Sequence, residues 1–157
     1  MSVPCLAPLD RAALDAAGVP EPWSFGMADR VRFSELDALN HVNNTVFLRW
    51  FESFRIPYFA EYGISLYDAD SPEVVLKSVA CTFHAPMFLG EDYIVTGRTL
   101  SYRRTSFRMA YAVFAPDLRA EGEAVIVLLR RDGSGRHPLG EAVKARLAER
   151  DGAVAEG

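Results

Sequence analysis

The sequence predicts an α+β fold in which a five-stranded antiparallel sheet wraps around one long central helix. Residues 45–62 carry aromatic side chains at three- and four-residue spacings, which is typical of a buried helix. One strand-like segment precedes this helix and four follow it, with gaps short enough for antiparallel hairpins. A helix this apolar needs a covering sheet to remove it from water.

Length and composition fit one domain, because the 157 residues are 50% hydrophobic and 24% charged. The net charge of −4 argues against a protein that coats nucleic acid or an anionic membrane. No apolar run approaches the roughly 20 residues of a membrane span, and the N-terminal region lacks a secretion-signal pattern. We therefore expect a cytoplasmic protein with reduced cysteines. We expect no metal site, because the histidines are scattered; they are His41, His84 and His137.

The pattern divides the chain into three parts. Residues 1–22 are expected to be an N-terminal appendage with a short helix that Gly18 ends. Residues 23–150 are expected to form the single domain. Residues 151–157 are expected to be a flexible tail.

The elements of the domain follow from hydrophobic periodicity. Residues 24–36 predict a strand, and the Asn- and Asp-rich tract that follows predicts a loop leading into the helix. Asn43 or Asn44 suits the N-cap, and Pro57 is expected to kink the helix or end its regular part. Further strands are predicted at 74–83, 92–102, 105–114 and 119–130, followed by a short amphipathic helix near 139–150.

The most informative tract is Ser34-Glu-Leu-Asp-Ala-Leu-Asn-His-Val-Asn-Asn44. It resembles the 4-hydroxybenzoyl-CoA thioesterase-like branch of the hot-dog fold superfamily, whose pattern is a loop Asp, then Gly-His-Val-Asn-Asn, then a helix with aromatic-Glu-x-x-Arg. Asn40 stands where relatives usually have Gly, a mild departure because Asn tolerates positive φ. Glu35 stands where relatives often have Asp. The matching residues are Asp37, His41, Val42, Asn43, Asn44, Phe51, Glu52 and Arg55.

The resemblance extends over roughly residues 24–131. Three later segments support it mainly by their order and spacing: Phe83-His-Ala-Pro86, Gly90-Glu-Asp92 and Arg104-Thr-Ser-Phe107. It implies a hot-dog fold thioesterase that hydrolyses an acyl-CoA or aryl-CoA to a free acid and CoA. Coenzyme A is then part of the substrate, so no separate cofactor is implied.

Asp37 is the expected nucleophile or general base. It precedes Asn44 by seven residues and so lies close to the predicted helix start. A helix N-terminus presents unpaired backbone N–H groups, which can stabilise an oxyanion. By resemblance, the backbone amide of Asn44 is the oxyanion donor.

Further candidate site residues lie near Asp37 in the sequence or on the predicted helix. His41, Asn43 and Trp50 are candidates for substrate contact, although Asn43 fits a plain N-cap better and Trp50 fits the core. Glu52 and Arg55 are three apart on the helix, a spacing that predicts an ion pair.

Arg103 and Arg104 fall at a predicted hairpin of an acidic protein. They are either a solvated hairpin tip or a clamp for the phosphates of coenzyme A, which arginine binds well.

His84 is expected to have no catalytic part.

Two other functions stay open. Hot-dog hydratases and dehydratases act on enoyl-thioesters, but their usual Asp-x-Asn-Pro-x-His tract differs from Asp37-Ala-Leu-Asn-His41. A non-catalytic protein that binds acyl-thioesters would not need Asp37. Unpaired sheet edges, together with the family resemblance, predict that the chain forms a homodimer or a dimer of dimers.

Overall fold

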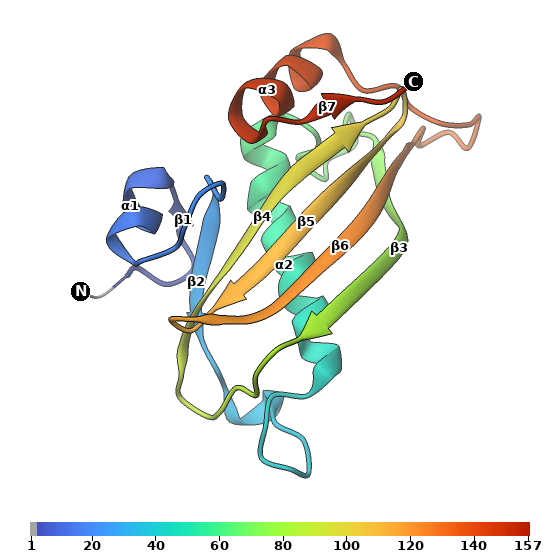
Figure 1. The fold of residues 1–157 in the computed structure, drawn as a ribbon. Helices are drawn as coiled ribbons and strands as arrows, with labels where there is room; N and C mark the ends of the chain where they lie inside the picture. Colours follow the sequence, from blue (N-terminus) through green and yellow to red (C-terminus); the bar gives the residue numbers. More distant parts are fainter. Residues whose placement is uncertain (1–2) are drawn as a thin grey trace.

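A computed structural model describes residues 3–157 and shows one sheet wrapped around one long helix (Figure 1). The main strands are β2 (Gly26–Arg30), β3 (Glu73–Phe83), β4 (Asp92–Tyr102), β5 (Ser106–Phe114) and β6 (Leu118–Leu129). The helices are α1 (Arg11–Ala16), α2 (Asn44–Tyr62) and α3 (Glu141–Asp151), and η1 (Phe33–Glu35) is a 3₁₀ turn. The predicted α+β hot-dog arrangement is confirmed. The sheet also gains two short strands that periodicity does not reveal, β1 (Pro8–Leu9) and β7 (Val154–Ala155).

The strand order is β1-β2-β4-β5-β6-β3, with β7 added parallel to β4 and all other pairs antiparallel. β3 is therefore an edge strand that pairs only with β6 within residues 3–157. It is 11 residues long, about 36 Å at the usual rise per residue, and most of its side chains are exposed. Such an edge is open to pairing with another chain.

The core lies between α2 and the concave face of the sheet. Phe51 and Phe54 of α2 are almost fully buried, and Phe51 stacks on Tyr111 with ring centroids 4.5 Å apart. Glycines let the sheet approach these rings closely. A Cβ at Gly97 would lie 2.4 Å from the Phe54 ring, and one at Gly122 would lie 2.8 Å from the Phe51 ring. The helix and the sheet are thus fitted to each other at these two strand positions.

Two details of α2 differ from the sequence-based expectation. Pro57 does not end the helix, which continues to Tyr62. Arg55 does not pair with Glu52: it points into the core and its Nη1 donates to the Tyr111 hydroxyl at 3.1 Å, while Glu52 stays exposed. The buried guanidinium needs a partner on the sheet, whereas Glu52 is hydrated, so helical spacing alone did not decide the pairing.

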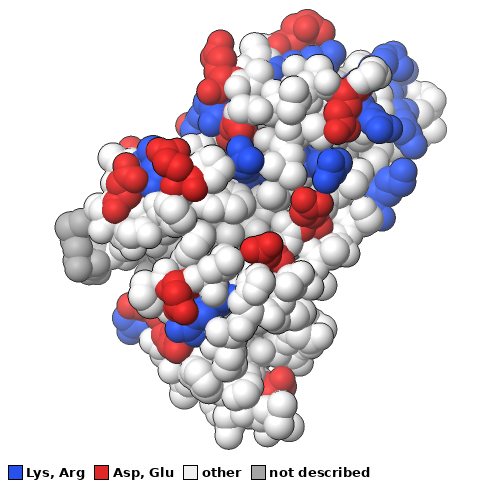
Figure 2. Space-filling model, viewed as in Figure 1, with Lys and Arg blue, Asp and Glu red and all other residues white. Residues whose placement is uncertain are grey.

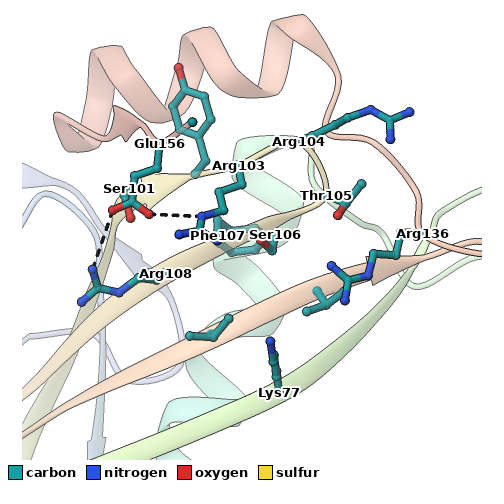
Figure 3. A pocket seen from close by; sticks show the side chains of 14 residues that line it. Lys77, Ser101, Arg103, Arg104, Thr105, Ser106, Phe107, Arg108, Arg136 and Glu156 are labelled. Atoms are coloured by element: carbon teal, nitrogen blue, oxygen red, sulfur yellow. Dashed lines mark ion pairs between the residues drawn. The ribbon is translucent and has the colours of Figure 1, made fainter.

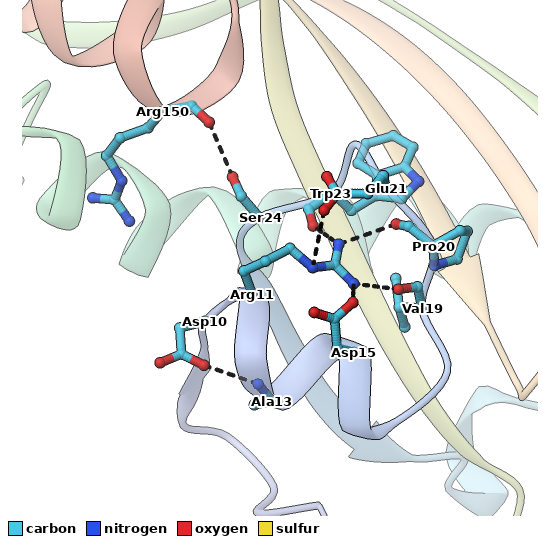
Figure 4. A network of polar contacts seen from close by, with 10 residues as sticks. All are labelled: Asp10, Arg11, Ala13, Asp15, Val19, Pro20, Glu21, Trp23, Ser24 and Arg150. Atoms are coloured by element: carbon cyan, nitrogen blue, oxygen red, sulfur yellow. Dashed lines mark hydrogen bonds and ion pairs between the residues drawn. The ribbon is translucent and has the colours of Figure 1, made fainter.

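Residues 3–22 pack on the outer face of the sheet rather than around α2. Leu9 and Leu14 are buried there against Ile94 and Phe114, in a second and smaller apolar cluster. The guanidinium of Arg11 holds the segment together. It donates to three backbone carbonyls and pairs with a nearby carboxylate, as Figure 4 shows for Val19, Pro20, Trp23 and Asp15.

The last residues are tied to the centre of the molecule through Asp151. Its carboxylate is 4% exposed and accepts hydrogen bonds from the hydroxyls of Tyr58 and Tyr62 and, at 2.8 Å, from the N–H of Thr99. Burial raises the pKa of Asp151 and of both tyrosines, and the nearby Asp151 adds to the tyrosine shifts. Beyond Asp151, where the sequence predicts a flexible tail, β7 pairs with β4.

Within residues 3–157, no helix has the length and apolar character needed to span a membrane. In the same part of the chain, no three His, Cys, Asp or Glu side chains are grouped in a way that could hold a metal ion.

Candidate active site

Asp37 lies in a tight turn that ends just before α2. The N–H of Asp37 donates to the carbonyl of His41 at 2.9 Å, and the N–H of Asn40 donates to the carbonyl of Asp37 at 3.0 Å. Asn40 has a φ of 60°, so it takes the left-handed conformation for which relatives use glycine. The turn thus brings Asp37 and His41 together at its base.

Glu35 anchors this turn to the rest of the protein. Its carbonyl accepts from the N–H of Asn43 at 2.9 Å, and its carboxylate accepts from the N–H of Arg32 at 2.8 Å and the indole N–H of Trp50 at 2.7 Å. The side chain is 8% exposed, so these bonds replace water as its partners. Glu35 therefore fixes the loop to the middle of α2, with a donor on each of its carboxylate oxygens.

Asn43 is the N-cap of α2, as the sequence predicts. Its side-chain oxygen accepts from the N–H of Thr45 at 2.9 Å. Asn44 is the first residue of the helix, and its N–H has no acceptor within residues 3–157. The helix start therefore offers an unpaired donor close to the Asp37 turn.

A hollow of about 370 Å³ joins Asp37, His41 and Asn44. One oxygen of the half-buried Asp37 accepts from the N–H of Leu39 at 2.9 Å, and its other oxygen has no protein donor within residues 3–157. The rest of the wall is mostly apolar: Val42, Phe47, Phe83, His84, Ala85, Pro86 and Met87. A carboxylate, a helix N-terminus and an apolar wall are what attack on a bound acyl group requires.

The two histidines of the hollow make different contacts. The ring of His41 meets Phe88 edge-on, with centroids 5.1 Å apart, and it lies on the same turn as Asp37. Nε2 of His84 lies 3.4 Å from a carboxylate oxygen of Glu121. His84 was not expected at the site. The motif Phe83-His-Ala-Pro86 was its only signal in the sequence.

Phenylalanines were expected in an acyl pocket, but the sequence did not single out the residues that form the apolar wall, which include Phe47, Phe83 and Met87. Phe47 and Phe83 meet edge-on with centroids 5.2 Å apart. Phe83 is half-exposed at the end of the edge strand β3, so it can contact a ligand or a second chain.

Trp50 does not line this hollow. It is 7% exposed, stacks on Tyr93 with centroids 4.0 Å apart, and donates its indole N–H to Glu35. Burial raises the pKa of the Tyr93 hydroxyl. Trp50 instead borders a different hollow, between α2 and β2. The structure therefore places Trp50 in the support of the loop, away from the hollow where an acyl group would meet Asp37.

Arg103 and Arg104 lie at the β4–β5 hairpin, as predicted, but at the other end of the molecule from Asp37 (Figure 1). The 19 residues of α2 separate the two ends by about 28 Å at the usual helical rise. Lys and Arg side chains gather at the hairpin end, whereas the opposite end is mostly uncharged in the same view (Figure 2). One chain therefore does not bring Asp37 and these arginines together.

Comparisons with known proteins agree with this geometry. Residues 31–147 match the family model of the thioesterase-like superfamily. A thioesterase superfamily structure from Jannaschia sp. CCS1 shares 48% identity and a TM-score of 0.96, covering 99% of this chain and 100% of that one. None of the curated proteins matches the chain.

More distant structures extend the likeness. A thioesterase from Thermus thermophilus, solved in complex with coenzyme A and Zn, shares 34% identity and a TM-score of 0.74 over 85% of this chain and 98% of that one. A predicted thioesterase from Bacillus stearothermophilus, with 22% identity and a TM-score of 0.72, covers 84% of this chain and 98% of that one and shows the fold alone. These likenesses support thioester hydrolysis as the general chemistry. The chain belongs to the thioesterase-like superfamily and has its hot-dog fold.

Proposed function

We propose that this protein hydrolyses an acyl-CoA or aryl-CoA thioester, with Asp37 as the attacking or base-providing carboxylate. The observation that carries the proposal is the shared hollow, which holds the Asp37 carboxylate, the start of α2 and an apolar wall. Within residues 3–157 the Asp37 carboxylate accepts one hydrogen bond, from a backbone N–H, so its second oxygen is available for a water molecule or a carbonyl carbon.

The start of α2 supplies the second half of the chemistry. Attack on a thioester carbonyl places negative charge on its oxygen, and an N–H group already in position stabilises that charge without reorganisation. The unpaired N–H of Asn44 suits this role. Asn43 acts by ordering the helix start, and the His41 ring borders the same hollow.

Coenzyme A is the proposed leaving group, and a second copy of the chain is proposed to bind its phosphates. The neighbour from Thermus thermophilus was solved with coenzyme A, which favours such a substrate here. Arg103 and Arg104 lie at the opposite end of α2 from Asp37 in one chain, so one substrate would have to span about 28 Å to meet both. A homodimer removes this difficulty if two β3 strands pair antiparallel across a two-fold axis.

The edge strand β3 suits this pairing. Val75, Leu76 and Phe83 are 40–46% exposed on it, so this unpaired edge carries apolar side chains that a second chain would cover. Antiparallel pairing sets the Glu73 end of one β3 beside the Phe83 end of the other. The hairpin end of the second copy, with its arginines, would then approach the Asp37 end of the first.

One assay tests the proposed reaction. The protein is incubated with a panel of saturated, aromatic and unsaturated acyl-CoAs, and free thiol and enoyl absorbance are followed together. We expect catalytic release of thiol from at least one member. Loss of enoyl absorbance without thiol release would identify a hydratase, and saturable binding without either signal would identify a binding protein.

A further inference from the structure

A second hollow, of about 440 Å³, lies beside the β4–β5 hairpin. Its residues Ser106, Arg108, Val125 and Val127 alternate along β5 and β6 with core-facing ones, so it opens on the side of the sheet away from α2 (Figure 3). The net charge of the protein is −4, yet this hollow concentrates cationic side chains. They are Lys77, Arg103, Arg104, Arg108 and Arg136.

One carboxylate, that of Glu156, occupies the middle of these cations. It lies 3.6 Å from Nε of Arg103 and 3.9 Å from Nη1 of Arg108. Figure 3 shows it between the two guanidinium groups, whereas Arg104 extends away from them. The backbone of Glu156 is held separately, because its N–H donates to the carbonyl of Tyr102 at 2.8 Å beyond β7.

The contacts of Glu156 are those of a weakly held anion. Both distances exceed the 2.7–2.9 Å of a direct charge-assisted hydrogen bond, and the side chains of Arg103 and Glu156 are 69% and 38% exposed. Exposed ion pairs of this kind contribute little. A phosphate monoester carries more charge and three acceptor oxygens, so it competes well for the same guanidinium groups.

Ser101 gives an independent sign of a ligand. It lines this hollow, is 3% exposed, and its hydroxyl has no hydrogen-bond partner within residues 3–157. A buried hydroxyl without a partner is uncommon, and a bound polar ligand would supply one.

We propose that Glu156 is a displaceable internal anion that occupies the phosphate position of this hollow and sets its affinity for phosphorylated ligands. This rests on the proposed function in that coenzyme A, with its phosphomonoester and diphosphate, is the ligand. In the free protein the carboxylate neutralises Arg103 and shares Arg108 with Glu123, whose carboxylate lies 3.1 Å from Nη2 of Arg108. A phosphate displaces the carboxylate, and weaker anions do not, so Glu156 makes the hollow selective for highly charged ligands.

Binding of free coenzyme A tests the proposal without any hydrolysis. Calorimetric titrations compare the parent chain with Glu156→Gln, which keeps the backbone pairing and removes the charge. We expect Glu156→Gln to bind coenzyme A roughly three- to tenfold more tightly at low salt, as one nearby repulsive charge predicts, with a smaller gain at high salt. Dephospho-coenzyme A should gain less, because it lacks the phosphomonoester.

Two further variants make the result specific. Glu149→Gln removes the same charge from an exposed residue of α3 outside the hollow, and we expect it to change affinity less than twofold. Arg103→Gln should weaken the binding of coenzyme A. Adding Glu156→Gln to this variant should increase the affinity for coenzyme A by less than it does in the parent chain. A tightening by loss of a charged group is not what structural damage produces.

Unchanged or weaker binding of coenzyme A by Glu156→Gln would overturn the proposal, and so would an equal gain in Glu149→Gln. Failure of the proposed function is a separate outcome. If Glu156→Gln tightens coenzyme A and inorganic pyrophosphate while no acyl-CoA is hydrolysed, the internal anion stands and the thioesterase assignment falls. If an acyl-CoA is hydrolysed and Glu156→Gln has no effect on binding, the thioesterase assignment stands and the internal anion falls.

Discussion

The indole N–H of Trp50 donates to the carboxylate of Glu35 at 2.7 Å, a buried bond that joins the middle of α2 to the loop carrying Asp37. Removing this carboxylate leaves the Trp50 N–H without a buried acceptor and frees the loop from the helix. The position of Asp37 relative to the helix start therefore depends on two residues that lie outside the hollow lined by Asp37.

We predict that Glu35→Ala lowers the free energy of unfolding by about 2 kcal/mol, the usual cost of a buried donor left unpaired. It should also lower kcat about tenfold with little change in KM, because the loop loses its position while substrate contacts remain. Urea unfolding and steady-state kinetics measure both effects. Glu52→Ala, at an exposed glutamate of α2, is the control and should change stability by no more than about 0.5 kcal/mol. Equal effects from both variants would contradict this role of Glu35.

The arginines of the hairpin are predicted to act on binding alone. Arg103→Ala with Arg104→Ala should raise KM for acyl-CoA roughly tenfold, since two exposed phosphate contacts of about 0.7 kcal/mol each amount to about 1.4 kcal/mol. kcat should stay nearly constant, because the phosphates are bound alike in ground and transition states. A short thioester without the nucleotide is the control substrate and should show no change. Equal losses on both substrates would make the arginines structural.

Burial of Tyr58 and Tyr62 predicts a loss of stability at alkaline pH. Their pKa values are raised above the ordinary 10.0 by burial first and then by Asp151. A group whose pKa is raised on folding contributes its full stability below the unfolded pKa. That stability is lost as the pH rises from about 10 toward the folded value, by about 1.4 kcal/mol per pH unit for each tyrosine.

Urea unfolding across this alkaline range measures the slope. In Tyr62→Phe the free energy of unfolding should fall less steeply with pH, by about 1.4 kcal/mol per pH unit, which is the share of one tyrosine. This difference in slope does not depend on the stability of the variant at neutral pH. An unchanged slope would show that Tyr62 ionises alike in the folded and unfolded chains.

The edge strand β3 is predicted to hold a dimer together. Val75→Lys with Leu76→Lys places charge on the exposed part of β3 and should convert the parent dimer to a monomer in light scattering. Activity should fall with it if the phosphates are bound by the second copy. Leu6→Lys, which also replaces an exposed apolar side chain but lies near β1, is the control and should leave the assembly intact. A parent chain that is a fully active monomer at micromolar concentration would contradict the proposed dimer.

Local pattern was enough for much of this structure. The order of the elements, the N-cap Asn43 and the positive φ of Asn40 all follow from residues that are neighbours in sequence. Contacts between distant residues were not predictable in this way. Asp151 lies 89 and 93 residues from Tyr62 and Tyr58, so no periodicity reveals that its segment is tied to the core.

The candidate site shows the same limit. The tract around Asp37 indicated its turn and the helix start, because the chain itself joins them. The sequence did not show that Trp50 faces Glu35 instead of the hollow, or that Arg103 lies at the far end of α2. Those facts depend on which way the helix faces and how the strands are ordered. Only the packed fold determines both.

Asp37→Asn is the variant that tests the central claim most directly. Asparagine keeps an oxygen that can accept from the N–H of Leu39, so the turn and the stability of the protein should be retained. It lacks the charge needed for attack or base catalysis, and kcat on the best acyl-CoA of the panel should fall a hundredfold or more, on the order of losing a catalytic base. Turnover near that of the parent chain, in a variant with unchanged unfolding, would contradict the assignment of Asp37 as the catalytic carboxylate.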